Sequence, residues 1–133
     1  MTKKKSTNDN ANEIVNAIIA GMQEKKAKKI VLIDLRQISN PLADYFVICS
    51  GTSDKQVDAI SESIEKFTFL NEKEEPWRTE GKNNFEWVIL DYINVVAHVF
   101  TEKMRDFYAL EELWGDGKIT VFEDEAEVKE LNN

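Results

Sequence analysis

The chain has 133 residues, of which 42% are hydrophobic and 32% charged, and its formal net charge is −8. This length suits a single soluble domain that buries roughly two-thirds of the surface of its unfolded chain. No apolar run approaches the roughly 20 residues that span a bilayer, and the polar N-terminus lacks the apolar core of a signal peptide. The single cysteine excludes an internal disulfide, so we expect a cytoplasmic protein that does not enter membranes.

The acidic balance also restricts the class of partner. Proteins that bind nucleic acids gain affinity by neutralising phosphates with Lys and Arg, whereas here 25 acidic residues outnumber 17 Lys and Arg. The basic clusters are short: Lys3–Lys5 suits a solvated tip, and Lys25–Lys29 suits a solvated helix end. We therefore predict no direct DNA binding and expect a basic protein partner, because complementary charges speed encounter.

Hydrophobic spacing in the first half predicts two helices and two strands. From about Asn10, apolar residues recur at helical spacing and predict a first helix. A short connection joins the β-branched runs Lys29–Leu35 and Asp44–Ser50, which predicts an antiparallel hairpin. Ser53 and Gln56 form a capping box that opens a second helix. The predicted inward stripe of this helix is Val57, Ile60, Ile64 and Phe67.

The second half predicts three more strands and a last helix. Trp77–Glu80 is expected to be a short strand, and Gly81–Asn84 a turn of the kind that joins hairpin strands. The apolar runs Trp87–Leu90 and Ile93–Phe100 follow, and then a short amphipathic helix that ends at Trp114. Strand, helix, strand order favours a parallel pair. We therefore predict an α/β (α+β) fold: a single domain with a mixed sheet of about five strands, flanked by helices.

The ends of the chain are polar. Residues 1–9 are expected to form a disordered tip, and residues 118–133, which are acidic, a frayed or disordered tail. The folded domain is predicted to span residues 10–117.

Residues for catalysis are scarce. One His and one Cys cannot form a zinc site, and no cofactor or metal is expected. Cys49 lies in an apolar strand and His98 on an apolar face, so both are interpreted as core residues, although a Cys49–His98 dyad stays open. The Gly51–Asp54 turn lies where a helix N-terminus can bind an anion. A small nucleotide-binding or nucleotidyl-transfer enzyme using this turn is the alternative function, although the carboxylate pairs that hold metal in such enzymes are absent.

Several sequence motifs resemble those of one known family. Asp91-Tyr92, the V-x-H-V-F of Val96–Phe100 and the R-x-F-Y-x-L-E-x-L-W-G of Arg105–Gly115 look like the signature of the ribosomal silencing factor (Iojap-like) family. D-Y-F-V-I-C-S-G-T-S at Asp44–Ser53 and the Glu80-Gly81 turn are similar to further elements of that family. Together these matches cover most of the predicted domain.

The resemblance implies a function without turnover. Members of this family bind the large ribosomal subunit at its fourteenth protein, block joining of the small subunit, and so repress translation when nutrients are scarce. It also implies a fold like that of nucleotidyltransferases but without their catalytic carboxylates, and self-association as a homodimer. An acidic domain that meets a basic ribosomal protein agrees with the charge argument.

Amphipathic aromatic and acidic side chains are the predicted contacts, because such residues anchor protein interfaces. Arg105 is expected to pair internally with Asp91 or Glu111. The family usually has glycine where this chain has Ile93, and we expect the turn to shift by one residue so that Asn94 takes the positive φ. The predicted partner-binding residues are Trp77, Trp87, Asp91, Tyr92, His98, Arg105, Tyr108, Glu111 and Trp114.

Overall fold

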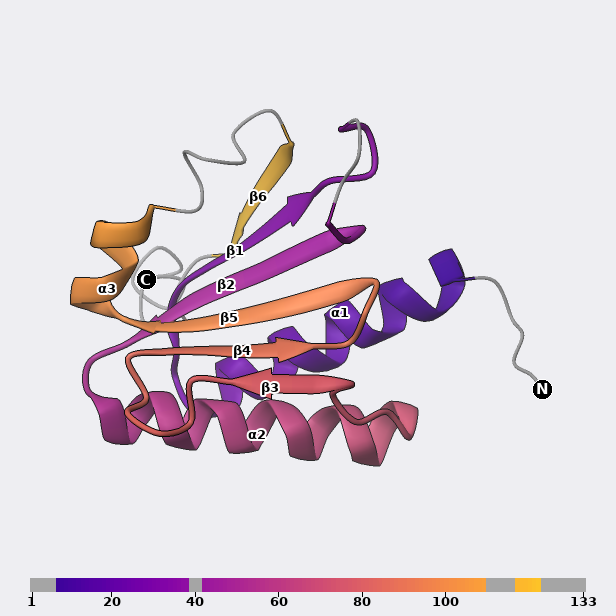
Figure 1. The fold of residues 1–133 in the computed structure, drawn as a ribbon. Helices are drawn as coiled ribbons and strands as arrows, with labels where there is room; N and C mark the ends of the chain where they lie inside the picture. Colours follow the sequence, from indigo (N-terminus) through magenta and orange to yellow (C-terminus); the bar gives the residue numbers. More distant parts are fainter. Residues whose placement is uncertain (1–6, 39–41, 110–116, 123–133) are drawn as a thin grey trace, which may run out of the picture.

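A computed structural model describes residues 7–38, 42–109 and 117–122 of the chain. Three helices and six strands follow one another, and all six strands join one mixed sheet (Figure 1). The helices are α1 (Thr7–Glu24), α2 (Asp54–Glu72) and α3 (Glu102–Tyr108). The strands are β1 (Lys28–Asp34), β2 (Tyr45–Gly51), β3 (Arg78–Glu80), β4 (Trp87–Asp91), β5 (Val95–Thr101) and β6 (Lys118–Phe122).

The sheet order is β3-β4-β5-β2-β1-β6. The predicted hairpin of β1 and β2 is confirmed as an antiparallel pair. A parallel pair was predicted without naming its strands, and β2 and β5 form it. Every other neighbouring pair is antiparallel. The predicted α/β class with a mixed sheet and flanking helices is confirmed, whereas the likeness to nucleotidyltransferases stays a prediction.

Two expectations about the ends of the domain are wrong. Lys118–Phe122, expected to be part of a frayed tail, forms β6 against β1 and makes the sheet six-stranded. The free edge of β1 supplies backbone partners there, which a composition argument does not detect. The first helix begins at Thr7, inside the tip that was expected to be disordered, because polar residues extend the helix beyond its apolar stripe. Residues 123–133 lie outside the described residues.

Alternating side chains on the strands divide the core into two clusters. Val47, Val88 and Val99 face α1 and α2 and pack with the apolar stripes of both helices, including Ile18 and Ile64. Figure 1 shows these two helices on the same side of the sheet, with α3 beside the end of β5. The opposite face carries the second cluster, which contains Ile33, Phe46, Ile48 and Phe100.

Helices α1 and α2 approach closely at Gly21. A Cβ atom built on Gly21 would lie 2.8 Å from the Ile64 Cα atom, so only glycine fits at this crossing. The Ser63 hydroxyl donates a hydrogen bond of 2.8 Å to the Gly21 carbonyl, which satisfies a buried polar side chain at the contact. This contact sets the position of α2 against α1.

Candidate protein-binding site

The edge strand β3 presents the most exposed tryptophan among the described residues. The Trp77 side chain is 67% exposed, directly before β3. Its backbone N–H donates to the Asp91 carbonyl at 2.7 Å, and the Arg78 guanidinium lies 5.5 Å from its ring centroid. The backbone bond and the cation–π contact hold a large amphipathic side chain at the surface, where such groups anchor partners.

Charged side chains surround Trp77 on the same edge. The strand register pairs Arg78 with Asp91, and their side chains approach to 3.7 Å, while Arg78 and Glu80 approach to 3.4 Å. The Arg78–Glu80 pair is exposed on both sides and adds little stability, whereas the Asp91 side chain is only 17% exposed. The effect of the two pairs here is to fix a cation between two carboxylates beside the indole ring. We call Trp77, Arg78, Glu80, Asp91 and Ile93 the Trp77 patch.

Ile93 closes the Trp77 patch in a strained conformation. Its φ is +76°, so the expected shift of the positive φ to Asn94 is wrong. The Ile93 N–H donates to Asp91 Oδ1 at 2.7 Å, and the Asn94 N–H donates to the Tyr92 carbonyl at 3.0 Å. These bonds form a tight three-residue turn around Ile93, in which a β-branched residue is unfavourable. The Asp91 carboxylate therefore holds the turn as well as facing Arg78.

Replacing Ile93 with glycine is expected to stabilise the protein by about 1 kcal/mol. Relief of the left-handed strain is worth roughly 1–2 kcal/mol, and the extra chain entropy of glycine offsets about half of it. Ile93 is 58% exposed, so little packing is lost. The midpoint of urea unfolding should rise without a change of slope. The control Ile93→Val keeps the β-branch and should not raise the urea midpoint. A lower midpoint for Ile93→Gly would contradict the claim that the backbone of Ile93 is strained.

Trp87 belongs to an aromatic cluster on the other face of the sheet from α1 and α2. Its indole N–H donates to His98 Nδ1 at 3.1 Å, and its ring lies 4.9 Å from that of Phe100. The Phe46 ring meets His98 edge-on at 4.6 Å. Burial lowers the pKa of His98 to about 3, so the imidazole is neutral at physiological pH and accepts the indole bond.

Three predicted contact residues have interior side chains. Tyr92, His98 and Arg105 are 6%, 5% and 6% exposed. The Tyr92 hydroxyl bonds the Thr68 hydroxyl at 2.9 Å, and burial raises the pKa of Tyr92 to about 12. These three side chains have too little exposed area to contact a partner directly. Their role is to position neighbours, and Trp87, which is half-buried, keeps part of its ring accessible.

Arg105 has the internal position that was expected of it. Its Nη1 donates to the Lys29 carbonyl at 2.6 Å and to the Ser50 hydroxyl at 3.0 Å. Asp91, one of its two expected partners, is bound to Arg78 and the Ile93 turn on β4. The other, Glu111, lies outside the described residues, as does Trp114. Tyr108 ends α3, but its side chain is not among those described.

Arg78 and Ile93 are members of the Trp77 patch that were not predicted. The exposed cation directly after a tryptophan was a usable signal, because such neighbours often stack. The family glycine at the position of Ile93 was a usable signal for positive φ. The apolar run Ile93–Phe100, which begins there, favours a strand instead.

The candidates for catalysis do not come together. Cys49 and His98 lie on neighbouring strands but face opposite sides of the sheet, so they cannot form a dyad. Burial raises the pKa of the Cys49 thiol to about 12, which keeps it unreactive. Among the described residues, no three His, Cys, Asp or Glu side chains are grouped to hold a metal ion, and no helix is long and apolar enough to cross a membrane.

In the Gly51–Asp54 turn, the hydrogen-bond donors of Thr52 are already bonded within the protein. Ser53 caps α2 by accepting a hydrogen bond from the Gln56 N–H at 3.2 Å, as predicted. The Gln56 side-chain oxygen accepts from both the N–H and the hydroxyl of Thr52, at 2.6 and 2.9 Å. An anion at this turn would have to displace those bonds, so the geometry does not favour the nucleotide alternative.

Comparison with known proteins agrees with the fold. The family model described as "Ribosomal silencing factor during starvation" matches residues 8–133. The ribosomal silencing factor of Bacillus subtilis is 39% identical over 110 residues, covering 83% of this chain and 92% of that protein. That of Halalkalibacterium halodurans is 38% identical over 104 residues, covering 78% and 87%.

A solved structure gives the same result. The crystal structure of a Chromobacterium violaceum protein superposes with a TM-score of 0.73 at 30% identity, covering 78% of this chain and 85% of that one. The family match, over residues 8–133, extends from α1 to β6. The chain belongs to the ribosomal silencing factor family.

Proposed function

We propose that this protein binds the large ribosomal subunit at its fourteenth protein and there blocks joining of the small subunit, which represses translation when nutrients are limiting. It acts in the cytoplasm by occupying the joining surface, with no chemical turnover. Self-association as a homodimer stays a prediction. The observation that carries the proposal is the Trp77 patch, in a chain that belongs to a family of ribosomal silencing factors.

The chemistry of the Trp77 patch suits a basic protein partner. The exposed indole of Trp77 offers a large apolar surface that loses little conformational entropy on binding. Glu80 and Asp91 lie on either side of Arg78 and provide carboxylates for the Lys and Arg side chains of a partner. The net charge of −8 speeds encounter with a basic surface and makes the association rate fall with salt.

Co-sedimentation with isolated ribosomal subunits tests this proposal. The protein should pellet with large subunits, not with small ones, and less so as the salt concentration rises. It should also slow the joining of small to large subunits, followed by light scattering. Failure to pellet with large subunits at low salt would overturn the proposal, because electrostatic attraction is strongest there.

Replacing Trp77 with alanine should weaken large-subunit binding at least tenfold, because truncating a central tryptophan commonly costs 2 kcal/mol or more. The exposed side chain contributes little to folding, so the urea midpoint should hardly change. Val121→Ala is the matched control: Val121 is 66% exposed on β6, at the opposite edge of the sheet. Equal binding by the Trp77 and Val121 variants would exclude the Trp77 patch as the contact.

A further inference from the structure

A short turn concentrates positive charge on this acidic protein. Residues 25–29 read Lys-Lys-Ala-Lys-Lys, and we call the four lysines Lys25, Lys26, Lys28 and Lys29 the basic turn. The helix α1 ends at Glu24, and no basic residue lies in its last turn. Lys25 and Lys26 thus lie in the connection between α1 and β1, and Lys28 and Lys29 are the first two residues of β1, so the run is not a solvated helix end. We propose that the basic turn binds the phosphate backbone of ribosomal RNA.

The backbone of the basic turn is held from two sides. The Gln56 side-chain amide in the first turn of α2 donates to the carbonyls of Lys25 and Lys26, at 3.1 and 3.4 Å. Arg105 in α3 donates to the Lys29 carbonyl at 2.6 Å. These bonds occupy the carbonyls and fix the turn, so less chain entropy is lost when the lysine side chains meet a ligand.

The conformation of the basic turn is costly for lysine. Lys26 and Lys29 have φ of +58° and +54°, a region that glycine or asparagine enters more easily. At Lys26 this backbone conformation closes the C-terminus of α1, where the Ala27 N–H donates to the Met22 carbonyl at 3.0 Å. Three of the four lysines are exposed, namely Lys25, Lys26 and Lys29, and Lys28 is half-buried. Their charged groups therefore lie at the surface.

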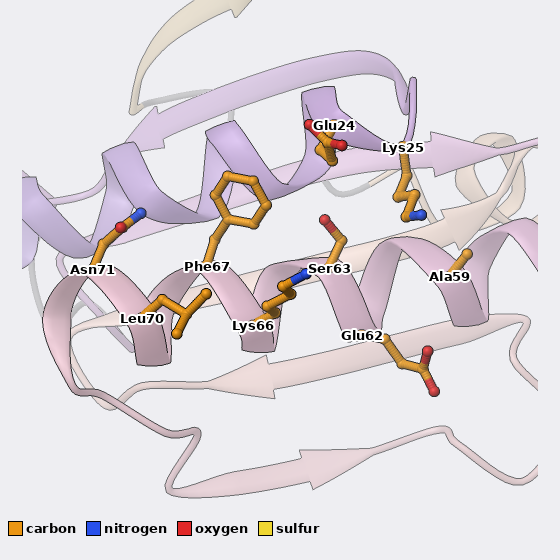
Figure 2. A pocket seen from close by; sticks show the side chains of 9 residues that line it. All are labelled: Glu24, Lys25, Ala59, Glu62, Ser63, Lys66, Phe67, Leu70 and Asn71. Carbon is orange, nitrogen blue, oxygen red and sulfur yellow. The ribbon is translucent and has the colours of Figure 1, made fainter.

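The groove next to the basic turn does not share its charge. A groove of about 440 Å³ lies between α1 and α2, and Figure 2 shows Lys25 extending toward α2 at one end of it. Lys25 and Lys66 are balanced there by Glu24 and Glu62. The groove is thus neutral in sum with Lys25 included, and Lys26, Lys28 and Lys29 are the lysines of the basic turn that lie outside its lining.

The position of the basic turn fits a second point of attachment. Gln56 places it beside the start of α2, whereas Trp77 follows the end of that helix. The 19 residues of α2 separate the two by about 28 Å at 1.5 Å per residue. A basic protein attracted to Glu80 and Asp91 would repel the basic turn. RNA phosphates are the main negative charge of a ribosomal subunit, and lysines neutralise them without reading sequence.

This inference rests on the proposed ribosome binding, and charge-matched variants separate the two. The turn variant is Lys25→Gln, Lys26→Gln and Lys29→Gln; the control is Lys73→Gln, Lys82→Gln and Lys118→Gln. Each has a net charge of −11, which is −8 less three positive charges. Large-subunit binding by the turn variant should fall about tenfold or more, and its log–log salt dependence should become shallower by about two. The control should bind as the wild type does.

The identity of the partner requires a crosslink. A photoreactive amino acid at Lys26, irradiated on large subunits, should join the protein to RNA in a product that ribonuclease digests. A crosslink to a ribosomal protein, or within the chain itself, would overturn the inference. The inference would also be overturned if both triple variants lost large-subunit binding equally, or if the turn variant lost none. In either case, pelleting of the wild type with large subunits would still uphold the proposed function. Absence of wild-type pelleting would overturn both.

Discussion

Replacement of Gly81 by alanine is expected to destabilise the protein by at least about 3 kcal/mol, because it combines backbone strain with overpacking. Gly81 has φ of +91°, which an L side chain rarely adopts. A Cβ atom built there would lie 1.9 Å from the Trp87 carbonyl oxygen and 3.1 Å from the Val88 Cα atom. Both neighbours are backbone of β4, which pairs with β5 along Trp87–Asp91 and cannot move away cheaply.

Two measurements show whether the loss of stability in the Gly81 variant is global or confined to the edge strand. Urea unfolding reports the global free energy of unfolding, while hydrogen exchange at the Trp77 N–H, which bonds the Asp91 carbonyl, reports separation of the edge strand alone. Gly51→Ala is the milder control, since φ at Gly51 is not in the left-handed region and its Cβ would approach two side-chain atoms and the Val57 backbone nitrogen no closer than 3.2 Å. A Gly81 variant within about 1 kcal/mol of wild type and with an unchanged Trp77 exchange rate would contradict the crowding.

The central sheet was predictable from sequence because each signal was local. The hairpin of β1 and β2 followed from the short link between two β-branched runs, and the presence of a parallel pair from strand, helix, strand order. That β5 rather than β3 lies beside β2 did not follow from the sequence. Strand β6 was not predictable in this way. Its Ile119 and Val121 remain exposed on the sheet, so no demand for burial marks the strand, and its partner β1 lies far away in the sequence.

The candidate site was only partly predictable, since amphipathic aromatics suit both surfaces and interiors. Both Trp77 and Tyr92 were predicted contacts, yet Trp77 lies at the edge before β3 whereas the Tyr92 hydroxyl reaches Thr68 on α2. The packing of α2 against Tyr92 cannot be predicted from the sequence alone. The conformation of Ile93 depends likewise on the Asp91 side chain, which a propensity scale does not contain. Family membership supplies the ribosomal role but does not locate the contact residues.

Acidification is expected to destabilise the protein through His98. Burial lowers the pKa of His98 from 6.5 to about 3, and the described rings around it, Phe46, Trp87 and Phe100, have no charge to compensate a proton. The Trp87 indole N–H occupies Nδ1, and Nε2 has no hydrogen-bond partner within the described part of the chain. Protonation would therefore place an uncompensated cation in the core and break the indole bond.

The sign of the effect follows from proton binding. The unfolded chain takes up a proton at His98 near pH 6.5 and the folded protein only near pH 3, so this contribution is complete above pH 6.5 and is lost as the pH falls toward 3. At about 1.4 kcal/mol per pKa unit, the loss is on the order of 5 kcal/mol, comparable to the whole stability of a small domain. Urea unfolding measured across this range should show it.

His98→Gln isolates the histidine from other titrating groups. The Arg36 side chain lowers the pKa of Asp34 through a hydrogen bond, and that carboxylate adds a loss of stability at still lower pH in both proteins. Glutamine can accept the indole bond but does not titrate, so the difference between the two pH profiles is the contribution of His98. It should grow steadily below pH 6.5. Parallel profiles would mean that His98 is protonated in the folded protein, and that the Trp87 cluster tolerates a charge which its described surroundings do not balance.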